Sequence, residues 1–272
     1  MRNYLLPGAC RARSKWRENN LAQFRIAEPH PYRFVKLFAR EWVRYCGRTA
    51  YPMPFTLAFI HTSHVLIPTF AALAREKLEG AKCFHMVDES LIQNTIAAGH
   101  LTKTTTRRLV DLIGSAHEGG ADAVLVTCSS IGPAIPIARQ VHNFPILRVD
   151  EAMATKAVRS AERIGVAATL KTTLQPTVGL LREKAAEEQH RIEVLECLCK
   201  GAFEKVIAGD TAEHDRIVSE ALLSLTQTVD LVVLAQASMA RVVSQLPPDQ
   251  VRVPVLSSPE LAVEQARKLL KA

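Results

Sequence analysis

The sequence repeats itself once, at a distance of about 108 residues. Three segments of the first half recur in the same order in the second half, with offsets of 107 to 109 residues: Asp122–Ile131 with Asp230–Met239, Leu57–Thr62 with Ile164–Thr169, and Pro145–Glu151 with Pro254–Glu260. The period is too long for a solenoid, whose units are about 20 to 50 residues long. The repeat therefore predicts two similar domains, residues 53–160 and 161–272.

Short apolar runs alternate with longer helical patterns in both halves. The runs are rich in Val, Leu and Ile, as are strands that a parallel sheet buries on both faces. Strands are predicted at 57–62, 83–87, 123–127, 146–149, 164–168, 192–195, 231–235 and 253–256, and helices at 102–118, 173–189 and 210–228, among others. This alternation predicts an α/β fold of two pseudo-symmetric domains, each with a parallel sheet flanked by helices. We expect an active-site cleft between the domains, beyond the carboxyl ends of the strands, and a last helix that can pack back on the first domain.

Residues 1–52 differ in composition from the rest of the chain. They carry a net charge of +8, both tryptophans and all four tyrosines, whereas residues 53–272 carry a net charge of −1. We expect a basic, poorly ordered N-terminal extension; a basic arm for nucleic acid or membrane and a transit segment are the alternatives. Because the main body is not basic and no window holds the ~18 apolar residues of a membrane span, we expect neither a nucleic-acid nor a membrane partner.

The six cysteines are scattered, and no apolar signal segment precedes them, which favours a reducing cytoplasm over a disulfide framework. Cys197-x-Cys199 lacks a second ligand pair, and His61-x-x-His64 lacks thiols or carboxylates at ligand spacing, so we expect no metal site. The sequence also lacks Gly-x-Gly-x-x-Gly, a phosphate loop and Gly-x-Ser-x-Gly. These absences argue against nucleotide enzymes and against hydrolases with that serine motif, and we expect no cofactor.

A cysteine flanked by hydroxyl residues, Cys128, follows the strand predicted at 123–127. Pro133 suits the first turn of a helix with Ser130 or Gly132 as its cap, so Cys128 is expected at a helix N-terminus. The helix dipole there lowers the pKa of a thiol and attracts an anion. Cys128 is therefore the candidate catalytic residue, and a buried structural cysteine is the alternative.

Hydroxyl and amide side chains gather at the predicted carboxyl ends of strands in both halves. With backbone N–H groups they can hold a carboxylate and stabilise the enediolate that forms when Cα loses its proton. The residues assigned to substrate binding are Thr62, Ser63, Thr127, Ser129, Ser130, Thr169, Thr172, Thr173 and Ser238. Lys171, if it points inward, neutralises a second carboxylate; Asp88 is assigned to the site and His85 to the core. For each Ser or Thr alone, a helix cap or turn is the alternative.

The segments Ala123–Pro133, Arg163–Leu174 and Ala235–Met239 resemble the aspartate/glutamate racemase superfamily. This superfamily includes glutamate, aspartate and hydantoin racemases, maleate isomerase and arylmalonate decarboxylase. The resemblance covers essentially residues 54–272 and leaves the basic extension uncovered. It implies two pseudo-symmetric α/β domains with the site between them, a cofactor-independent enzyme of amino acid metabolism, and a homo-oligomer.

The resemblance also implies a role for two positions. In the cofactor-independent racemases of the superfamily, one cysteine removes the Cα proton as a thiolate and a second cysteine returns a proton to the opposite face. The first corresponds to Cys128. The repeat-related position of the second holds Gln236, and an amide is neither a general acid nor a general base at physiological pH. We assign Cys128, Asp88 and Gln236 to the catalytic set, with the two-thiol mechanism absent.

We expect a racemase or isomerase of a small carboxylic acid or amino acid, and three mechanisms remain open. Cys128 exchanges the Cα proton and works with a second proton donor, such as Asp88, His61 or His64. Alternatively, Cys128 alone protonates an enediolate, as in a decarboxylase or lyase. In the third, Cys128 adds to an unsaturated diacid during cis-trans isomerisation. A protein that binds a small acid without turnover is the non-enzymatic alternative.

Overall fold

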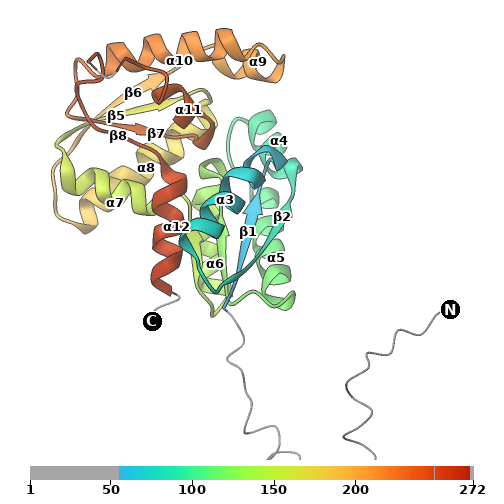
Figure 1. Ribbon diagram of the computed structural model, residues 1–272. Coiled ribbons are helices and arrows are strands. Elements are labelled where there is room, and N and C mark those ends of the chain that lie inside the picture. The colour runs from blue at the N-terminus through green and yellow to red at the C-terminus, as the bar shows by residue number, and fades with distance from the viewer. Residues whose placement is uncertain (1–54, 248, 270–272) are drawn as a thin grey trace, which may run out of the picture. The chain divides into compact units, whose positions relative to one another are not determined.

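The protein contains two parallel β-sheets with the same strand order. The computed structural model describes residues 55–247 and 249–269, so the predicted extension at 1–52 lies outside the described residues. The first sheet has the order β2-β1-β3-β4 and the second the order β6-β5-β7-β8 (Figure 1). The strands are β1 (Thr56–His61), β2 (Lys82–Val87), β3 (Ala123–Val126), β4 (Ile146–Arg148), β5 (Arg163–Ala168), β6 (Glu193–Leu198), β7 (Leu231–Leu234) and β8 (Val255–Leu256). All neighbouring strands in these sheets are parallel, which confirms the predicted α/β class.

Helices cover both faces of each sheet. The α-helices of the described residues are α3 (Ile67–Lys77), α4 (Glu89–Ala98), α5 (Lys103–Glu118), α6 (Ile135–Val141), α7 (Glu151–Ser160), α8 (Lys171–Glu187), α9 (Ala202–Ile207), α10 (Thr211–Leu225), α11 (Ala240–Val243) and α12 (Ser258–Leu269), and the 3₁₀ helices are η1 (His64–Leu66), η2 (Ser129–Ala134) and η3 (Ala237–Met239). On the first sheet, α5 and α6 cover one face, while α3 and α12 cover the other. On the second sheet, α7 and α8 cover one face, while α9, α10 and α11 cover the other. None of these helices is both long enough and apolar enough to cross a membrane.

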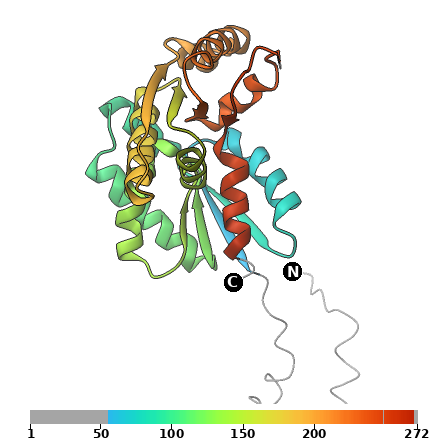
Figure 2. The ribbon, with the colours of Figure 1, turned by 90° about the vertical axis from the view of Figure 1, so that its left-hand side faces the viewer.

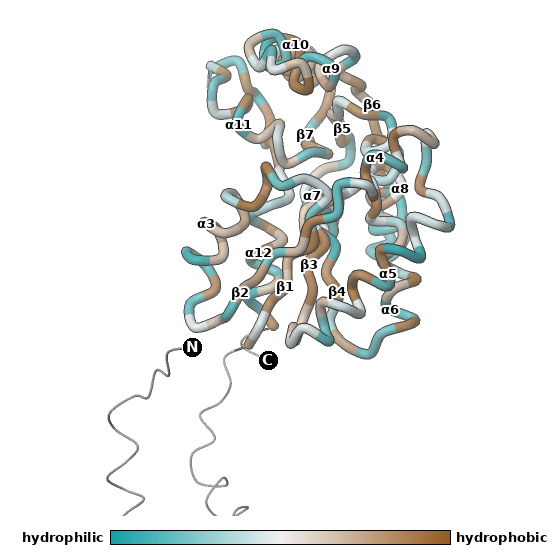
Figure 3. The backbone as a smooth tube through the Cα atoms, turned by 90° about the vertical axis from the view of Figure 1, so that its right-hand side faces the viewer, coloured by the Kyte–Doolittle hydropathy of each residue, from teal (hydrophilic) through white to brown (hydrophobic). Residues whose placement is uncertain are grey.

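Burial explains why the central strands read as continuous apolar runs. Every residue of β3 and of β7 is buried. Figure 3 shows the apolar stretches along β1 and β3 between the covering helices. The edge strand β6 is only partly buried, and this accounts for an error in the predicted range 192–195. The strand continues to Leu198 because its exposed edge tolerates Glu196, which accepts a hydrogen bond from Gln175 over 2.7 Å.

Three predicted helix starts need correction. The helix predicted from 173 is α8, which begins two residues earlier at Lys171. Thr102 and Asp210 lie one residue before α5 and α10, and each is the N-cap. Their side chains accept hydrogen bonds from the N–H groups of Thr105 and Glu213, over 3.1 and 3.2 Å. Capping satisfies N–H groups that have no partner inside the helix. These two polar residues therefore precede the first turn of their helices and do not belong to it.

The backbone hydrogen bonds of the two halves reproduce the repeat. Asp122 accepts a hydrogen bond from the N–H group of Thr56 over 2.7 Å. Asp230, at the repeat-related position, accepts one from the N–H group of Arg163 over 3.0 Å. In each half, an aspartate before the third strand thereby fixes the start of the first strand. The domain boundaries at 53–160 and 161–272 themselves stay a prediction.

The last helix crosses back to the first sheet. Three small side chains of α12, those of Ala262, Val263 and Ala266, lie in the same buried cluster as Leu57 and Phe59 of β1. Lys77 at the end of α3 pairs with Glu260 of α12 over 2.8 Å. In Figure 2, α12 lies between α3 and α7. The chain therefore passes between the two halves twice, once through α7 and once into α12.

Two glycines provide a test of core packing. A Cβ atom on Gly165 in β5 would lie 2.8 Å from Cγ of Leu225, whereas a Cβ atom on Gly179 in α8 would meet nothing within 4 Å. We expect Gly165→Ala to lower the free energy of unfolding by about 1–3 kcal/mol, because the core is overpacked. Gly179→Ala should raise it by about 0.5–1 kcal/mol, because alanine favours the helix. Urea unfolding measures both, and equal effects would contradict the tight packing at Gly165.

Candidate active site

Cys128 lies at the carboxyl end of β3. It is the N-cap residue of η2, which continues directly into α6. Sequence reasoning puts the cap at Ser130 or Gly132 and Pro133 in the first turn of the α-helix, and this detail is wrong. Pro133 lies inside η2, and Pro136 occupies the first turn of α6, because a 3₁₀ segment precedes the α-helix.

Hydrogen bonding by four donor groups lowers the pKa of the Cys128 thiol. The donors are the hydroxyl group of Thr62, the hydroxyl group of Ser130 and the N–H groups of Ser130 and Ile131. Burial nevertheless outweighs these bonds and raises the pKa of Cys128 above its usual value. The expected lowering of this pKa by the helix dipole is therefore wrong in sign, because removing a thiolate from water costs more than the donors return. At neutral pH the group is therefore a protonated thiol.

A hydrogen bond joins the Cys128 loop to the second half of the molecule. Ser130 Oγ and Thr173 Oγ1 lie 2.7 Å apart, and both side chains are buried. Thr173 belongs to the first turn of α8, which begins at Lys171 immediately after the carboxyl end of β5. The structure thus brings together the predicted site segments that follow β3 and β5.

Gln236 is bonded to the same β5 segment. Its Oε1 accepts hydrogen bonds from the N–H and hydroxyl groups of Thr169, over 2.6 and 2.9 Å. Because an N–H group can only donate, this pairing identifies the oxygen of the amide and leaves Nε2 with no hydrogen bond among the described residues. Gln236 is the N-cap of η3 with φ −126° and ψ 132°, close to φ −123° and ψ 117° at Cys128. The two repeat-related positions have the same backbone and different chemistry.

The remaining binding candidates occupy different surroundings. Thr62 and Ser129 are buried, whereas Ser238 is exposed in the middle of η3. Ser63 is the N-cap of η1, and its side chain makes no capping bond. Thr172 Oγ1 is buried and has no hydrogen-bond partner among the described residues. Thr172 and Lys171 line a pocket of about 500 Å³ beside the Ser130–Thr173 contact, and Arg148 lies in its wall.

Sequence reasoning missed the ion pair between Arg148 and Asp150. Arg148 Nε and Asp150 Oδ1 are 2.7 Å apart, and the two side chains are 7% and 0% exposed. Arg148 also donates to the carbonyl of Pro176 in α8 over 3.2 Å. The guanidinium packs against Gly132 of η2, where a Cβ atom would lie 2.3 Å from Nε. This pair therefore fixes η2 against α8.

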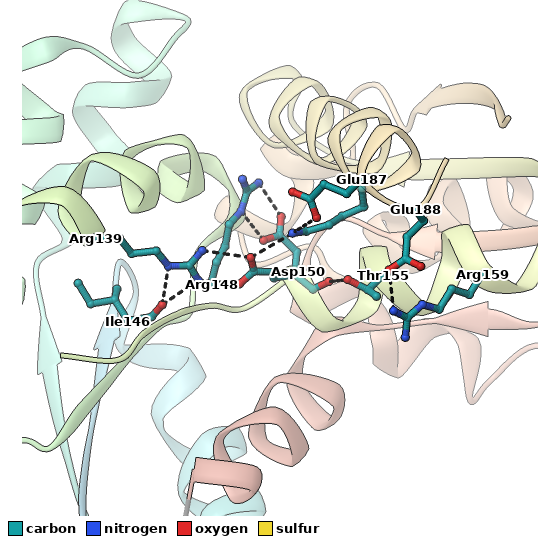
Figure 4. A network of polar contacts seen from close by, with 10 residues as sticks. Arg139, Ile146, Arg148, Asp150, Thr155, Arg159, Glu187 and Glu188 are labelled. Atoms are coloured by element: carbon teal, nitrogen blue, oxygen red, sulfur yellow. Dashed lines mark hydrogen bonds and ion pairs between the residues drawn. The ribbon is translucent and has the colours of Figure 1, made fainter. Parts of the chain in front are cut away.

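The ion pair belongs to a larger polar network (Figure 4). Next to Asp150, Glu151 pairs with Arg139 over 2.7 Å and with Lys184 over 3.4 Å. Burial opposes the ionisation of Glu151, but these two cations outweigh it and hold its pKa below the usual value. The network connects α6, α7 and α8 behind the candidate site. The sequence signal is the Arg-x-Asp-Glu run at the end of β4, which reads as an ordinary strand end.

His61, Thr127 and His85 form a buried chain of hydrogen bonds. His61 Nδ1 lies 2.9 Å from Thr127 Oγ1, and His61 Nε2 lies 2.8 Å from His85 Nδ1. Thr127 Oγ1 donates its only hydrogen to the carbonyl of Ile60, so His61 must donate from Nδ1 and accept at Nε2. Burial, with a smaller contribution from His85, lowers the pKa of His61 to about 4. His61 is neutral at physiological pH and packs with Phe59 on the face of the sheet opposite Cys128.

The structure gives the other proton-donor candidates partners of their own. Asp88 is the N-cap of α4: it accepts a hydrogen bond from Ser90 N–H over 3.0 Å and pairs with Arg108 over 2.7 Å. His64 pairs with Glu89 over 2.7 Å at the surface. Among the described residues, no three His, Cys, Asp or Glu side chains are arranged to hold a metal ion. Asp88 and His64 therefore have structural roles that leave the Cys128 thiol as the candidate proton-transfer group.

The two parallel sheets with a thiol at a strand end define a two-domain α/β protein with a candidate thiol site. The family model described as Asp/Glu/Hydantoin racemase matches residues 60–266. The chain belongs to this family. No curated protein matches the sequence.

Solved structures of racemases have the same fold. The chain is similar to a glutamate racemase isoform from Bacillus anthracis, with a TM-score of 0.64 and 16% identity over 80% of this chain and 82% of that one. For an aspartate racemase from Picrophilus torridus, the TM-score is 0.63 and the identity is 14%, over 80% of this chain and 94% of that one. For an allantoin racemase from Klebsiella pneumoniae, the TM-score is 0.59 and the identity is 19%, over 80% of this chain and 88% of that one. At these identities the likeness shows the fold alone.

The buried ion pair makes a prediction about stability. We expect Arg148→Met to lower the free energy of unfolding by about 3–5 kcal/mol, because Asp150 is then left buried without its partner. The matched control is Arg163→Met, which removes an exposed pair with Asp230 (53% and 42% exposed) and should leave the free energy of unfolding nearly unchanged. Urea unfolding at neutral pH measures both, and similar losses would contradict the special role of Arg148.

The lowered pKa of His61 predicts how stability depends on pH. The unfolded chain takes up a proton on His61 near pH 6.5, while the folded chain resists protonation down to about 4. Stability therefore falls as the pH falls through this window, and His61 accounts for about 3 kcal/mol of the loss. We expect His61→Gln to flatten the profile between pH 6.5 and 4. The exposed His64→Gln serves as the control, and an unchanged slope in His61→Gln would contradict the assignment.

Proposed function

We propose that the chain is a cofactor-independent racemase or isomerase of a small carboxylic acid or amino acid, in which Cys128 exchanges the Cα proton. Membership of the racemase family supports the reaction class. The observation that carries the proposal is the set of donors around the Cys128 thiol, at the point where Ser130 meets Thr173 of the second half. Such donors stabilise negative charge on sulfur or on a substrate oxygen.

The donors of the second half fit a carboxylate. The Oε1 atom of Gln236 is occupied by Thr169, so its NH₂ group is the end available to a ligand. An NH₂ group donates two hydrogen bonds and matches a carboxylate oxygen. Lys171 and Thr172 line the neighbouring pocket, where a second carboxylate of a diacid finds a cation and an unpartnered hydroxyl oxygen.

The proton transfer follows from the chemistry of the thiol. Cys128 first loses its proton to solvent; the thiolate then takes the Cα proton, and the electron pair of the C–H bond passes into the enediolate. A raised pKa makes the thiolate scarcer at neutral pH but makes each thiolate a stronger base toward a weakly acidic Cα proton. The thiol then exchanges its proton with solvent and returns a solvent proton to Cα, which completes the exchange. The rate therefore rises with pH beyond the usual range of a cysteine.

The amide at Gln236 favours a second candidate function, a one-face enzyme, which exchanges protons with only one face of the substrate. Inversion needs a proton on the opposite face of the substrate, and an amide does not supply it. His61 lies on the other face of the sheet, and Asp88 is paired with Arg108. A single thiol that protonates an enediolate from one side suits a decarboxylase, a lyase or a cis-trans isomerase.

Solvent-deuterium exchange tests the proposal. The protein is incubated in D₂O with a panel of amino acids, hydantoins and small diacids, and NMR follows deuterium at Cα. We expect exchange that Cys128→Ala reduces by about 10²–10⁴-fold, the usual contribution of a general acid or base. Cys83→Ala, at an exposed thiol of β2, should exchange like the wild type.

The stereochemical outcome separates the candidates. Exchange with inversion supports the racemase and requires a second proton source, whereas exchange without inversion supports the one-face enzyme. Gln236→Cys restores a second thiol and should add inversion to a one-face exchange. Saturable binding of a panel acid with no exchange in the wild type overturns the enzymatic proposal in favour of a binding protein.

A further inference from the structure

Two cysteine thiols meet at the end of the edge strand β6. Cys197 lies within β6, and Cys199 follows the strand directly. The chain turns sharply at Cys199, since Lys200 N–H donates to the carbonyl of Leu198 over 2.9 Å. Both side chains belong to the same cluster between the sheet and α10, and each thiol changes the pKa of the other. The turn thus leaves both thiols on the same side of the sheet, next to α10.

The two thiols differ in access. Cys199 is 2% exposed, whereas Cys197 is partly exposed and lines an open pocket of about 320 Å³. The other walls of this pocket come from β6 and from the end of α10, including Glu196, Ser224 and Thr228. A small molecule can therefore reach Cys197, whereas Cys199 of the same cluster is closed off from solvent. This is the arrangement of an attacking cysteine with a resolving cysteine.

The thiols also differ in acidity. The hydrogen bond from Cys199 lowers the pKa of Cys197 to about 7, although burial opposes the shift. The same contact raises the pKa of Cys199. A thiol whose pKa is near the ambient pH is the best attacking group in thiol–disulfide exchange. Cys83 is exposed at the surface, but its partial removal from water raises the pKa of its thiol, so this thiol has no such activation.

We propose that Cys197 and Cys199 form a reversible thiol–disulfide site that reacts with a low-molecular-weight disulfide such as oxidised glutathione. The Cys197 thiolate attacks one sulfur of the small disulfide, forms a mixed disulfide and releases one glutathione thiolate. Cys199 then loses its proton and attacks the Cys197 sulfur, forming the intramolecular disulfide and releasing the second glutathione. The protein dithiol loses two electrons, and the small disulfide gains them as two thiols.

The dithiol is one hydrogen bond away from the candidate active site. The N–H group of Cys199 donates to the carbonyl of Ala168 over 2.8 Å. Ala168 is the last residue of β5, and the next residue, Thr169, holds the side chain of Gln236. A Cys197–Cys199 bond changes the turn at Cys199 and so acts on the strand end that orients Gln236. The effect of this link on activity rests on the proposed function, whereas the geometry of the link does not depend on turnover.

Mass spectrometry with peptide mapping tests the site. Reduced protein is incubated with oxidised glutathione at pH 7, and the peptide that contains both cysteines should lose two hydrogens. Cys199→Ser should accumulate a glutathione adduct on Cys197, and Cys197→Ser should form neither disulfide nor adduct there. The adduct on Cys197 should form roughly 10-fold faster than one on Cys83, because the gain in thiolate is partly offset by lower nucleophilicity. Cys83→Ser is the matched control and should oxidise like the wild type.

The coupling to the site has its own readout. The side-chain amide signal of Gln236 in a nitrogen-15 NMR spectrum should shift between the reduced and oxidised protein, and it should not shift in Cys197→Ser. An adduct confined to Cys83 or Cys128, or no loss of hydrogens at the pair, overturns the thiol–disulfide site. A failed deuterium-exchange assay leaves both of these readouts unaffected, so the two proposals fail separately.

Discussion

The buried ion pair of Arg148 and Asp150 holds the candidate site together. A charge with almost no contact with water is stable only if its partner and its hydrogen bonds are complete. Arg148 meets this demand with three groups: the Asp150 carboxylate, the Pro176 carbonyl of α8 and the space above Gly132 of η2. Because each belongs to a different element, their positions are fixed together. The Ser130–Thr173 bond and the donors around Cys128 depend on this alignment of η2 with α8.

The two halves share a backbone and differ at the residue that matters for chemistry. Cys128 and Gln236 cap equivalent 3₁₀ helices with nearly equal φ and ψ. On one side the donors converge on a thiol, while on the other an amide is held by its oxygen and presents its NH₂ group. The duplicated fold thus pairs a group that carries a proton with one that carries only hydrogen bonds. This asymmetry is the basis for considering both racemisation and one-face protonation.

Much of the fold follows from the sequence, because repeats and apolar runs report burial directly. The third strands of both halves, β3 and β7, are buried throughout and are found within one residue of their predicted ends. Strand ends also locate Cys128, Thr169 and Gln236, since parallel strands end at one edge of a sheet. The sequence does not show how deeply a side chain is buried. The pKa of Cys128 is raised because the effect of burial exceeds that of the surrounding donors, and only the packed structure shows this.

Contacts between side chains that lie far apart in the sequence cannot be predicted from it either. Asp88 follows a strand, as a site residue does, but Arg108 lies on α5, 20 residues away, and takes its carboxylate. Arg148 reads as one more strand residue until its contact with Pro176, 28 residues later, is seen. His61 and Thr127 are 66 residues apart and become neighbours through the pairing of β1 with β3. Such contacts depend on register and on rotamers, which composition and periodicity do not encode.

The return of α12 to the first sheet has a mechanical consequence. The chain passes between the halves through α7 and again into α12, and these two helices pack against each other. Two connections side by side resist twisting of one half relative to the other and leave bending about a single axis as the soft motion. A bend at α7 therefore has to be matched by a bend at the end of β8, where the chain enters α12.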